Sequence, residues 1–253
     1  MKIDIGGFFQ DLGNFFGGGA VLGVDIGTAS IKAVEIFRRK GLLSLKNYGI
    51  LETRGYLEHP SRAIQTGALK ISEREVVRLL KILLRDMKIG TKKAFFTLPS
   101  FSAFITVLDM PELSPEETAR AVRFQAQQFI PLPIEKVSLD WTRVALYEHT
   151  SGGTYQKVLL IGVPGETVTL YQNIAKRAGL KLVGLEVESL SLARALLSSD
   201  TKTSILIDIG ALATNIIVGE KGLLRYSSQA DYGGMYLTNA LAGSLGISMV
   251  RAE

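Results

Sequence analysis

Two stretches of the chain nearly repeat each other: VLGVDIGTASIKAVEIFRRKGLL at residues 21–43 and ILIDIGALATNIIVGEKGLL at residues 205–224. Each copy has an apolar run that ends in Asp-Ile-Gly, a few small residues, a β-branched run and Lys-Gly-Leu-Leu. A short apolar run followed by an alternating, β-branched run predicts strand, tight turn and strand. We therefore expect two similar β-hairpins in this chain of 253 residues.

Each predicted hairpin places an acid at the end of a buried strand and a glycine in the turn. The first has Asp25 and Gly27, and the second has Asp208 and Gly210. Glycine lets the backbone turn sharply and approach a ligand, and successive N–H groups of a turn can bind phosphate. The acids would hold magnesium, through water, because this ion keeps most of its hydration shell. Two such hairpins facing each other would bind a polyphosphate from both sides.

One Asp-Ile-Gly alone is typical of an ordinary turn, so the doubled motif is what favours a nucleotide cleft. Gly233 and Gly234 precede a predicted helix that carries Leu237, Leu241 and Leu245 on one side. A helix N-terminus favours negative charge, which makes this glycine pair either a further anion contact or a plain turn.

The composition excludes several classes of site. The chain is 47% apolar and 21% charged and has no cysteine, so a sizeable core is possible, whereas disulfides and thiolate ligands are not. This fits a cytoplasmic protein. Residues 1–93 hold 16 Lys and Arg against 9 Asp and Glu, a surplus of +7, and the remaining 13 against 15 give −2. A positive first third could face anionic lipid, and without a basic run interleaved with aromatics we expect no nucleic-acid partner.

Further patterns divide the chain. Residues 1–20 form a leader rich in Phe and Gly, which is either a mobile segment or an interfacial anchor. Capping boxes predict helices after Ser72 and Ser114, the first closed by Gly90. Residues 93–187 alternate strands and helices and are predicted to be an inserted α+β subdomain. Residues 188–200 would form a return helix to the first lobe, and residues 201–253 would begin a second lobe.

The two hairpin sequences resemble the phosphate motifs of the superfamily of actin, sugar-kinase and heat-shock-chaperone ATPases. Within it, FIPLP at residues 129–133 and VESLSLARAL at residues 187–196 are similar to the type IV pilus assembly family PilM, relatives of the division protein FtsA. The resemblance implies an α/β, actin-like (ribonuclease H-like) fold of two lobes, the first at residues 21–92, with an inserted small α+β subdomain. It also implies ATP and magnesium between the lobes.

The resemblance further implies a partner and a place. Members of the PilM family bind the cytoplasmic tail of the inner-membrane protein PilN at the cytoplasmic face of the inner membrane. They connect the pilus platform to its motor. The family's phosphate-binding positions correspond here to Asp25, Gly27, Thr28, Ser30, Lys32, Asp208, Gly210, Thr214, Gly233 and Gly234. Since family members are longer, we expect an incomplete second lobe and leave ATP hydrolysis open.

Two other functions stay open. A sugar or carboxylate kinase would need a base aimed at a substrate hydroxyl, for which Asp109, Asp140, Glu186 and Glu188 are available. A membrane tether of the FtsA type would need the Phe-rich leader as its anchor. Trp141 and the phenylalanines at 95, 96, 101 and 104 could line a peptide groove, although aromatic residues at such positions are more often core.

Overall fold

The computed structural model describes residues 19–40, 42–53, 72–150, 152–197, 202–220 and 223–253. The predicted leader lies outside the described residues except for Gly19 and Ala20. The last three residues of the predicted return helix, 198–200, also lie outside them.

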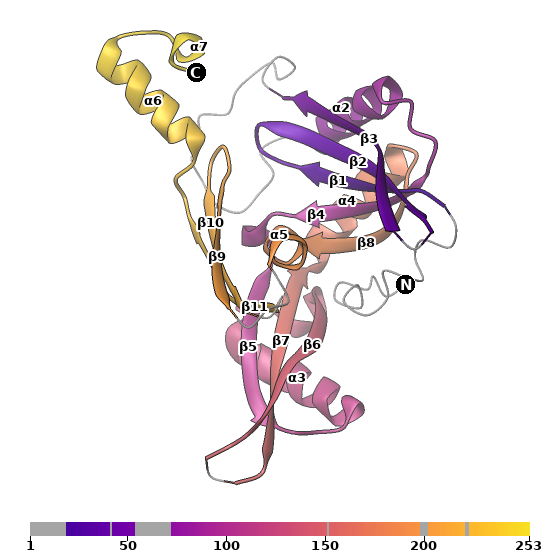
Figure 1. The fold of residues 1–253 in the computed structure, drawn as a ribbon, viewed down its shortest axis with the longest axis vertical. Helices are drawn as coiled ribbons and strands as arrows, with labels where there is room; N and C mark the ends of the chain where they lie inside the picture. The colour runs from indigo at the N-terminus through magenta and orange to yellow at the C-terminus, as the bar shows by residue number, and fades with distance from the viewer. Residues whose placement is uncertain (1–18, 41, 54–71, 151, 198–201, 221–222) are drawn as a thin grey trace.

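The first lobe is built on a five-stranded sheet with the order β3-β2-β1-β4-β8. As predicted, β1 and β2 form an antiparallel hairpin, and β3 extends it, whereas β4 and β8 continue the sheet in parallel with β1 (Figure 1). The strands are β1 (Val21–Ile26), β2 (Ser30–Arg39), β3 (Leu42–Glu52), β4 (Lys93–Leu98) and β8 (Lys181–Val187).

Helix α2 (Glu73–Asp86) packs on this sheet beside α4 (Gly165–Arg177). Its Val76 and Leu79 are fully buried in one core with Leu22 of β1. The predicted capping box is present, because the Ser72 side chain accepts from the Glu75 N–H and the Glu75 carboxylate from the Ser72 N–H. The predicted stop at Gly90 is wrong: the chain leaves the helix at Lys88, with a φ of 52°, and the Ile89 N–H donates to the Leu84 carbonyl.

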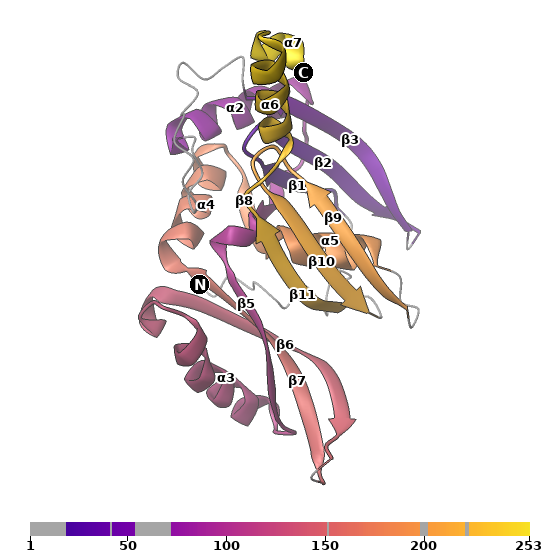
Figure 2. The same cartoon turned by 90° about the vertical axis from the view of Figure 1, so that its left-hand side faces the viewer.

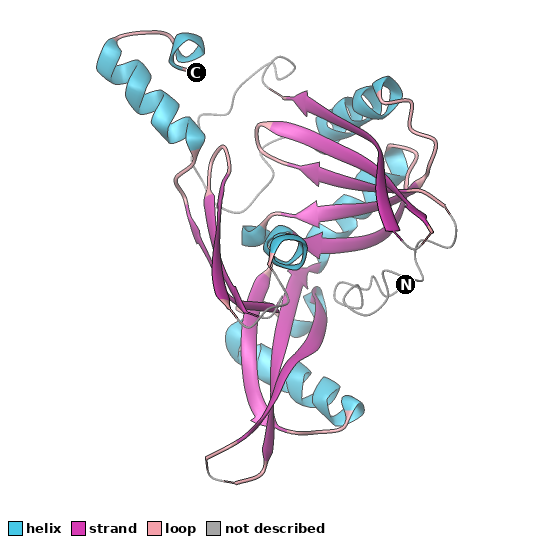
Figure 3. Cartoon of the chain, in the orientation of Figure 1, coloured by secondary structure: helices cyan, strands magenta, loops and turns pink. Residues whose placement is uncertain are grey.

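The inserted subdomain is smaller than predicted. We expected residues 93–187, but β4 and β8 belong to the first-lobe sheet, and α4 packs against α2. A separate three-stranded sheet with the order β5-β7-β6, covered by one helix, forms the insertion (Figure 3). Its elements are β5 (Phe104–Pro111), α3 (Pro115–Phe129), β6 (Val137–Glu148) and β7 (Thr154–Pro164), with short 3-10 turns η1 (Ser100–Ser102) and η2 (Ile134–Lys136). Helix α3 has the predicted capping box at Ser114.

Helix α5 (Glu188–Leu196), predicted to return to the first lobe, follows β8 and contacts β4 and β8 of the first-lobe sheet as well as β10 and β11. The second lobe contains a three-stranded sheet of order β11-β10-β9. Its elements are β9 (Thr203–Ile209), β10 (Thr214–Glu220), β11 (Leu223–Ala230), α6 (Gly234–Leu245) and α7 (Met249–Ala252). Figure 2 shows α6 continuing away from this sheet, and its predicted apolar stripe at Leu237, Leu241 and Leu245 is exposed. Among the described residues, no helix is both long enough and apolar enough to cross a membrane.

Candidate functional site

The two repeated hairpins have the same turn geometry. The Gly27 N–H donates to the Ser30 carbonyl at 3.0 Å, and the Gly210 N–H donates to the Ala213 carbonyl at 2.8 Å. A Cβ atom at Gly27 or at Gly210 would lie 3.0 Å from that same carbonyl oxygen. Both turns therefore favour glycine for the same reason, which is the short distance from the Cβ position to a backbone oxygen and not a positive φ.

The first turn is fixed through its carbonyl groups. The Thr53 N–H donates to the Ala29 carbonyl at 2.9 Å, and the Thr53 hydroxyl donates to the Thr28 carbonyl at 3.4 Å. Among the described residues, the N–H groups of Thr28 and Ala29 donate to no backbone carbonyl. Because the carbonyls are bound, these N–H groups are the ones left to meet an anion.

The second turn is fixed in the same way by a different element. The first N–H groups of α6, from Gly234 and Met235, donate to the carbonyls of Gly210 and Ala211, both at 2.9 Å. A Cβ at Gly233 would lie 2.6 Å from that backbone, so only glycine fits there. We left the glycine pair open between an anion contact and a plain turn. In the structure it lets α6 pack closely on the second turn, and its contact with an anion stays a prediction.

The acid of each hairpin lies next to last in its strand and faces a polar side chain on the neighbouring strand. Asp25 is paired in register with Lys32, whose Nζ lies 3.4 Å from Asp25 Oδ2. Asp208 is paired with Asn215, whose Nδ2 donates to Asp208 Oδ2 at 3.2 Å. Thr97, at the end of β4, donates to Asp25 Oδ1 at 2.7 Å.

Glu188, the first residue of α5, lies between the two acids. Asn215 donates to it from the second lobe at 3.1 Å. Burial raises the pKa of Glu188 to about 8, aided by a hydrogen bond with Asp208 and by the negative charges of Asp25 and Asp208, and opposed by a hydrogen bond from the Ser100 backbone. Carboxylates from both hairpins thus act on one side chain, so the two turns face a shared region.

Several buried oxygen atoms around Glu188 have no hydrogen-bond partner among the described residues. They include the Tyr171 hydroxyl, the Ser189 hydroxyl and the Asn215 carbonyl oxygen. Burial, with the charges of Asp25 and Glu188, raises the pKa of Tyr171. Buried polar atoms without partners are uncommon in proteins, and they fit a site that takes up water or a hydrated ion. Among the described residues, no three His, Asp or Glu side chains are close enough to hold a bare metal ion.

The structure therefore joins Asp25, Lys32 and Asp208 through Thr97, Asn215 and Glu188, of which the sequence named only Glu188, as one of four acids available to a kinase. Thr214, predicted to contact phosphate, donates its hydroxyl to the Tyr232 carbonyl at 2.6 Å. Asn215 could have been found by aligning the repeats, because it stands seven residues after its acid, as Lys32 does. Thr53 and Thr97 carry no comparable signal.

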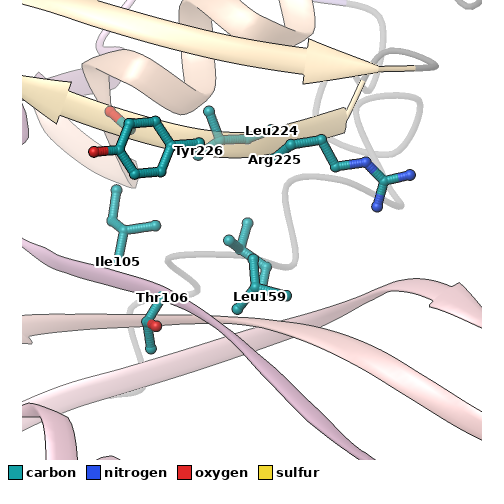
Figure 4. Close-up of a pocket in the computed structure, with 8 residues that line it drawn as sticks. Ile105, Thr106, Leu159, Leu224, Arg225 and Tyr226 are labelled. Carbon is teal, nitrogen blue, oxygen red and sulfur yellow. The ribbon is translucent and has the colours of Figure 1, made fainter. Parts of the chain in front are cut away.

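A groove lies between the inserted subdomain and the second lobe. It consists of two hollows of about 170 and 160 Å³ that share Ile105 and Ser227. Figure 4 shows the first of them. The strands on its two sides, β5 and β11, are each at the edge of their sheet. Of the aromatic residues that we considered for a peptide groove, Phe101 lines it, whereas Phe96 is in the core of the first lobe and Trp141 packs against that of the insertion.

Comparison with known proteins identifies the family. The model for "Type IV pilus assembly protein PilM" matches residues 23–253. The chain belongs to the PilM family. It superposes on a chain of a PilM-PilN type IV pilus biogenesis complex with a TM-score of 0.75 and 22% identity, covering 92% of this chain and 67% of that one. It is 23% identical to the cell division protein FtsA of Pseudomonas aeruginosa over 251 residues, covering 90% of this chain and 58% of that protein.

The predicted actin-like α/β fold is confirmed. The ethanolamine utilization protein EutJ from Carboxydothermus hydrogenoformans also has this fold, with a TM-score of 0.52, 20% identity and coverage of 91% of this chain and 58% of that one. The chain spans little more than half the length of FtsA and about two thirds of the solved PilM chain.

Proposed function

We propose that this PilM-family chain is a nucleotide-dependent scaffold of the type IV pilus assembly platform. In this proposal the two hairpins bind ATP with magnesium between the lobes, and the protein binds the cytoplasmic tail of a PilN-like inner-membrane protein. Membership of the PilM family supports this function over a sugar kinase. The observation that carries the nucleotide site is the link from Asn215 of the second lobe to Glu188, which Asp25 and Asp208 both influence.

The proposed phosphate contacts are the N–H groups of the two turns and the Lys32 ammonium. Lys32 lies 3.4 Å from Asp25, and half of its side-chain surface is exposed, so it can turn toward a phosphate without leaving a buried charge behind. Asp25 and Asp208 would hold a hydrated magnesium ion, which would neutralise phosphate charge. The oxygen atoms without partners near Glu188 would accept from its water shell.

Nucleotide would act by joining the lobes. A ligand shifts an equilibrium between open and closed states only as far as it binds one of them better. A polyphosphate that touches both turns has that preference, because an open cleft offers it only one turn. Whether closure is followed by hydrolysis depends on Glu188, whose raised pKa makes it a hydrogen-bond donor toward Asp208 near neutral pH rather than a ready base.

We propose the groove between β5 and β11 as the place where a tail peptide binds. Two edge strands leave backbone N–H and carbonyl groups that an extended peptide can pair with. Ile105, Leu159 and Tyr226 supply apolar contacts on both sides of the groove. Because β11 continues from the second hairpin, closure of the lobes would change the width of this groove.

The test is binding of ATP with magnesium, measured by calorimetry, to the wild type and to Asp25→Asn with Asp208→Asn. We expect the double variant to lose binding, whereas Asp86→Asn, an exposed acid on α2, keeps it. Equal affinity in all three proteins would refute the cleft. Fluorescence anisotropy of a labelled PilN-like tail tests the partner separately, and Ile105→Arg should abolish it without changing nucleotide affinity.

A further inference from the structure

The end of the first-lobe sheet farthest from Asp25 collects positive charge. Strands β1, β4 and β8 begin there, and β2 turns into β3 there, since Arg39 pairs with Leu42 and Val21 with Ile36. The tip of the β2–β3 hairpin exposes Arg38, Arg39 and Lys40. Figure 1 shows this tip and the starts of β1, β4 and β8 on the side of the lobe away from β9 and β10.

Cations from the neighbouring elements extend this surface. Lys93 and Lys181 are register partners at the starts of β4 and β8, and Lys92 accepts a backbone hydrogen bond from Lys181. Lys88 follows the C-cap of α2, and the Lys46 Nζ lies 3.9 Å from the position of a Cβ at Gly90. Lys46 pairs with the buried Glu35 at 3.0 Å, so one acid offsets one of these charges. We call the hairpin tip with these strand starts the basal patch.

Leucine side chains stand among the charges at the hairpin tip. Leu42 is 73% exposed and Leu43 is 56% exposed, and Leu45 is exposed beside them. The second copy of Lys-Gly-Leu-Leu behaves differently, because Leu224, the counterpart of Leu43, is 3% exposed and belongs to the core. The last leucine of the motif is therefore buried in the second lobe and exposed in the first.

We infer that the basal patch binds the surface of an anionic lipid bilayer. Long cationic side chains gain from lipid phosphates, and exposed leucines at a narrow tip can enter the headgroup boundary. A soluble acidic partner could bind the cationic side chains, but it would not account for the two leucines exposed at the tip. The patch lies at the opposite end of the sheet from Asp25, so contact with a bilayer leaves the proposed cleft open to solution.

The chain enters the sheet at the same patch. The Thr91 hydroxyl, just before β4, donates to the Ala20 carbonyl at 2.7 Å. Residues 1–18, which include four phenylalanines, lie outside the described residues. Because phenylalanine can also bind a bilayer, the experiment must separate these residues from the hairpin.

Co-sedimentation with vesicles tests the inference on the full chain, independently of nucleotide. We expect the protein to bind vesicles of phosphatidylcholine with phosphatidylglycerol and not vesicles of phosphatidylcholine alone. Binding should weaken as salt rises, because the screening length falls from about 10 Å at 0.1 M to about 3 Å at 1 M. Absence of binding to the anionic vesicles at low salt would overturn the inference.

Matched variants locate the contact. Arg39→Glu with Lys40→Glu should weaken binding roughly 20-fold or more, since each basic residue near such a surface contributes about fivefold. Leu42→Ser with Leu43→Ser should weaken it at least about threefold. Arg120→Glu with Arg123→Glu makes the same change of net charge on exposed positions of α3 and should leave binding within about twofold. Thermal unfolding of each variant verifies that it is folded.

Three outcomes would count against the hairpin. Equal losses in the α3 control would show that only net charge matters. Loss with the charge variant but none with the leucine variant would point to a soluble polyanion instead of a bilayer. Loss on changing Phe8, Phe9, Phe15 and Phe16 to serine, with the hairpin variants binding like the wild type, would assign the contact to the leader.

Discussion

The adjacent glycines 233 and 234 should respond to alanine in opposite directions. A Cβ at Gly233 would meet the Ala211 carbonyl carbon and the Gly210 oxygen at 2.6 Å, and both are backbone atoms that cannot turn aside. At Gly234 the nearest atom would be the Gly210 oxygen at 3.8 Å, an ordinary contact. The φ of Gly233 is −142°, which any residue can adopt, so the difference is one of space alone.

The size of the effect follows from what Gly233→Ala must break. To make room, α6 has to move away from the turn, which removes the hydrogen bonds from Gly234 and Met235. At about 1 kcal/mol net for each backbone hydrogen bond, the loss is about 2 kcal/mol, within the range for overpacking. Gly234→Ala keeps both bonds and gains up to about 1 kcal/mol of helix propensity. The two variants should therefore differ by about 3 kcal/mol.

Hydrogen exchange is the suitable measurement, because α6 is attached at one end and can undock without unfolding of the first lobe. A loss of 2 kcal/mol should speed exchange of the Gly234 and Met235 amides roughly 30-fold in Gly233→Ala. In Gly234→Ala these amides should exchange at the wild-type rate or more slowly. Similar exchange in both variants, or faster exchange in Gly234→Ala, would refute the close contact between α6 and the second turn.

Other positions give further expected results. Glu188→Gln should flatten the pH dependence of stability. The pKa of Glu188 is raised from 4.5 to about 8, so its contribution to stability is complete below pH 4.5 and is lost as the pH rises through 8, with a ceiling of about 5 kcal/mol. Thermal melts of the variant and the wild type should therefore diverge at pH 9 and not at pH 4. Asn215→Ala removes the amide between Asp208 and Glu188, and calorimetry should show at least about tenfold weaker nucleotide binding with an unchanged melting temperature of the first lobe. Ser72→Ala should cost about 1 kcal/mol and lower the melting temperature by about 2–4 °C, whereas Ser114→Ala should loosen only α3, as limited proteolysis would show.

Local patterns allowed the sequence to predict both hairpins and two helix starts. Those features depend on residues a few positions apart, such as Ser72 and Glu75, or Gly27 and Ser30. The sequence did not predict the limits of the insertion, because an apolar strand such as β4 or β8 does not say which sheet it joins. Nor did it single out Glu188 among the four available acids, because the position of Glu188 next to Asp208 depends on the approach of two lobes.

The repeated Lys-Gly-Leu-Leu shows that the sequence also does not predict which of two similar residues is buried. Identical residues end up exposed at Leu43 and buried at Leu224, because the second hairpin packs against α5 and β5, whereas the first ends at the rim of its sheet. Sequence alone gives the strand and the turn in each copy. Which copy meets solvent depends on the neighbouring elements.

The two hairpins differ in the residue that lies opposite each acid. Lys32 and Asn215 occupy the same register position opposite their acids, yet one is a cation with half of its side-chain surface exposed and the other is a buried amide. A cation at the first hairpin suits the capture of a phosphate from solution, since it gives up only a solvent-exposed ion pair. The buried amide at the second hairpin donates to both Glu188 and Asp208, so moving it would take a donor away from both acids. If the proposed function is right, the first hairpin would bind the phosphate, and the second would transmit that binding to α5 and α6.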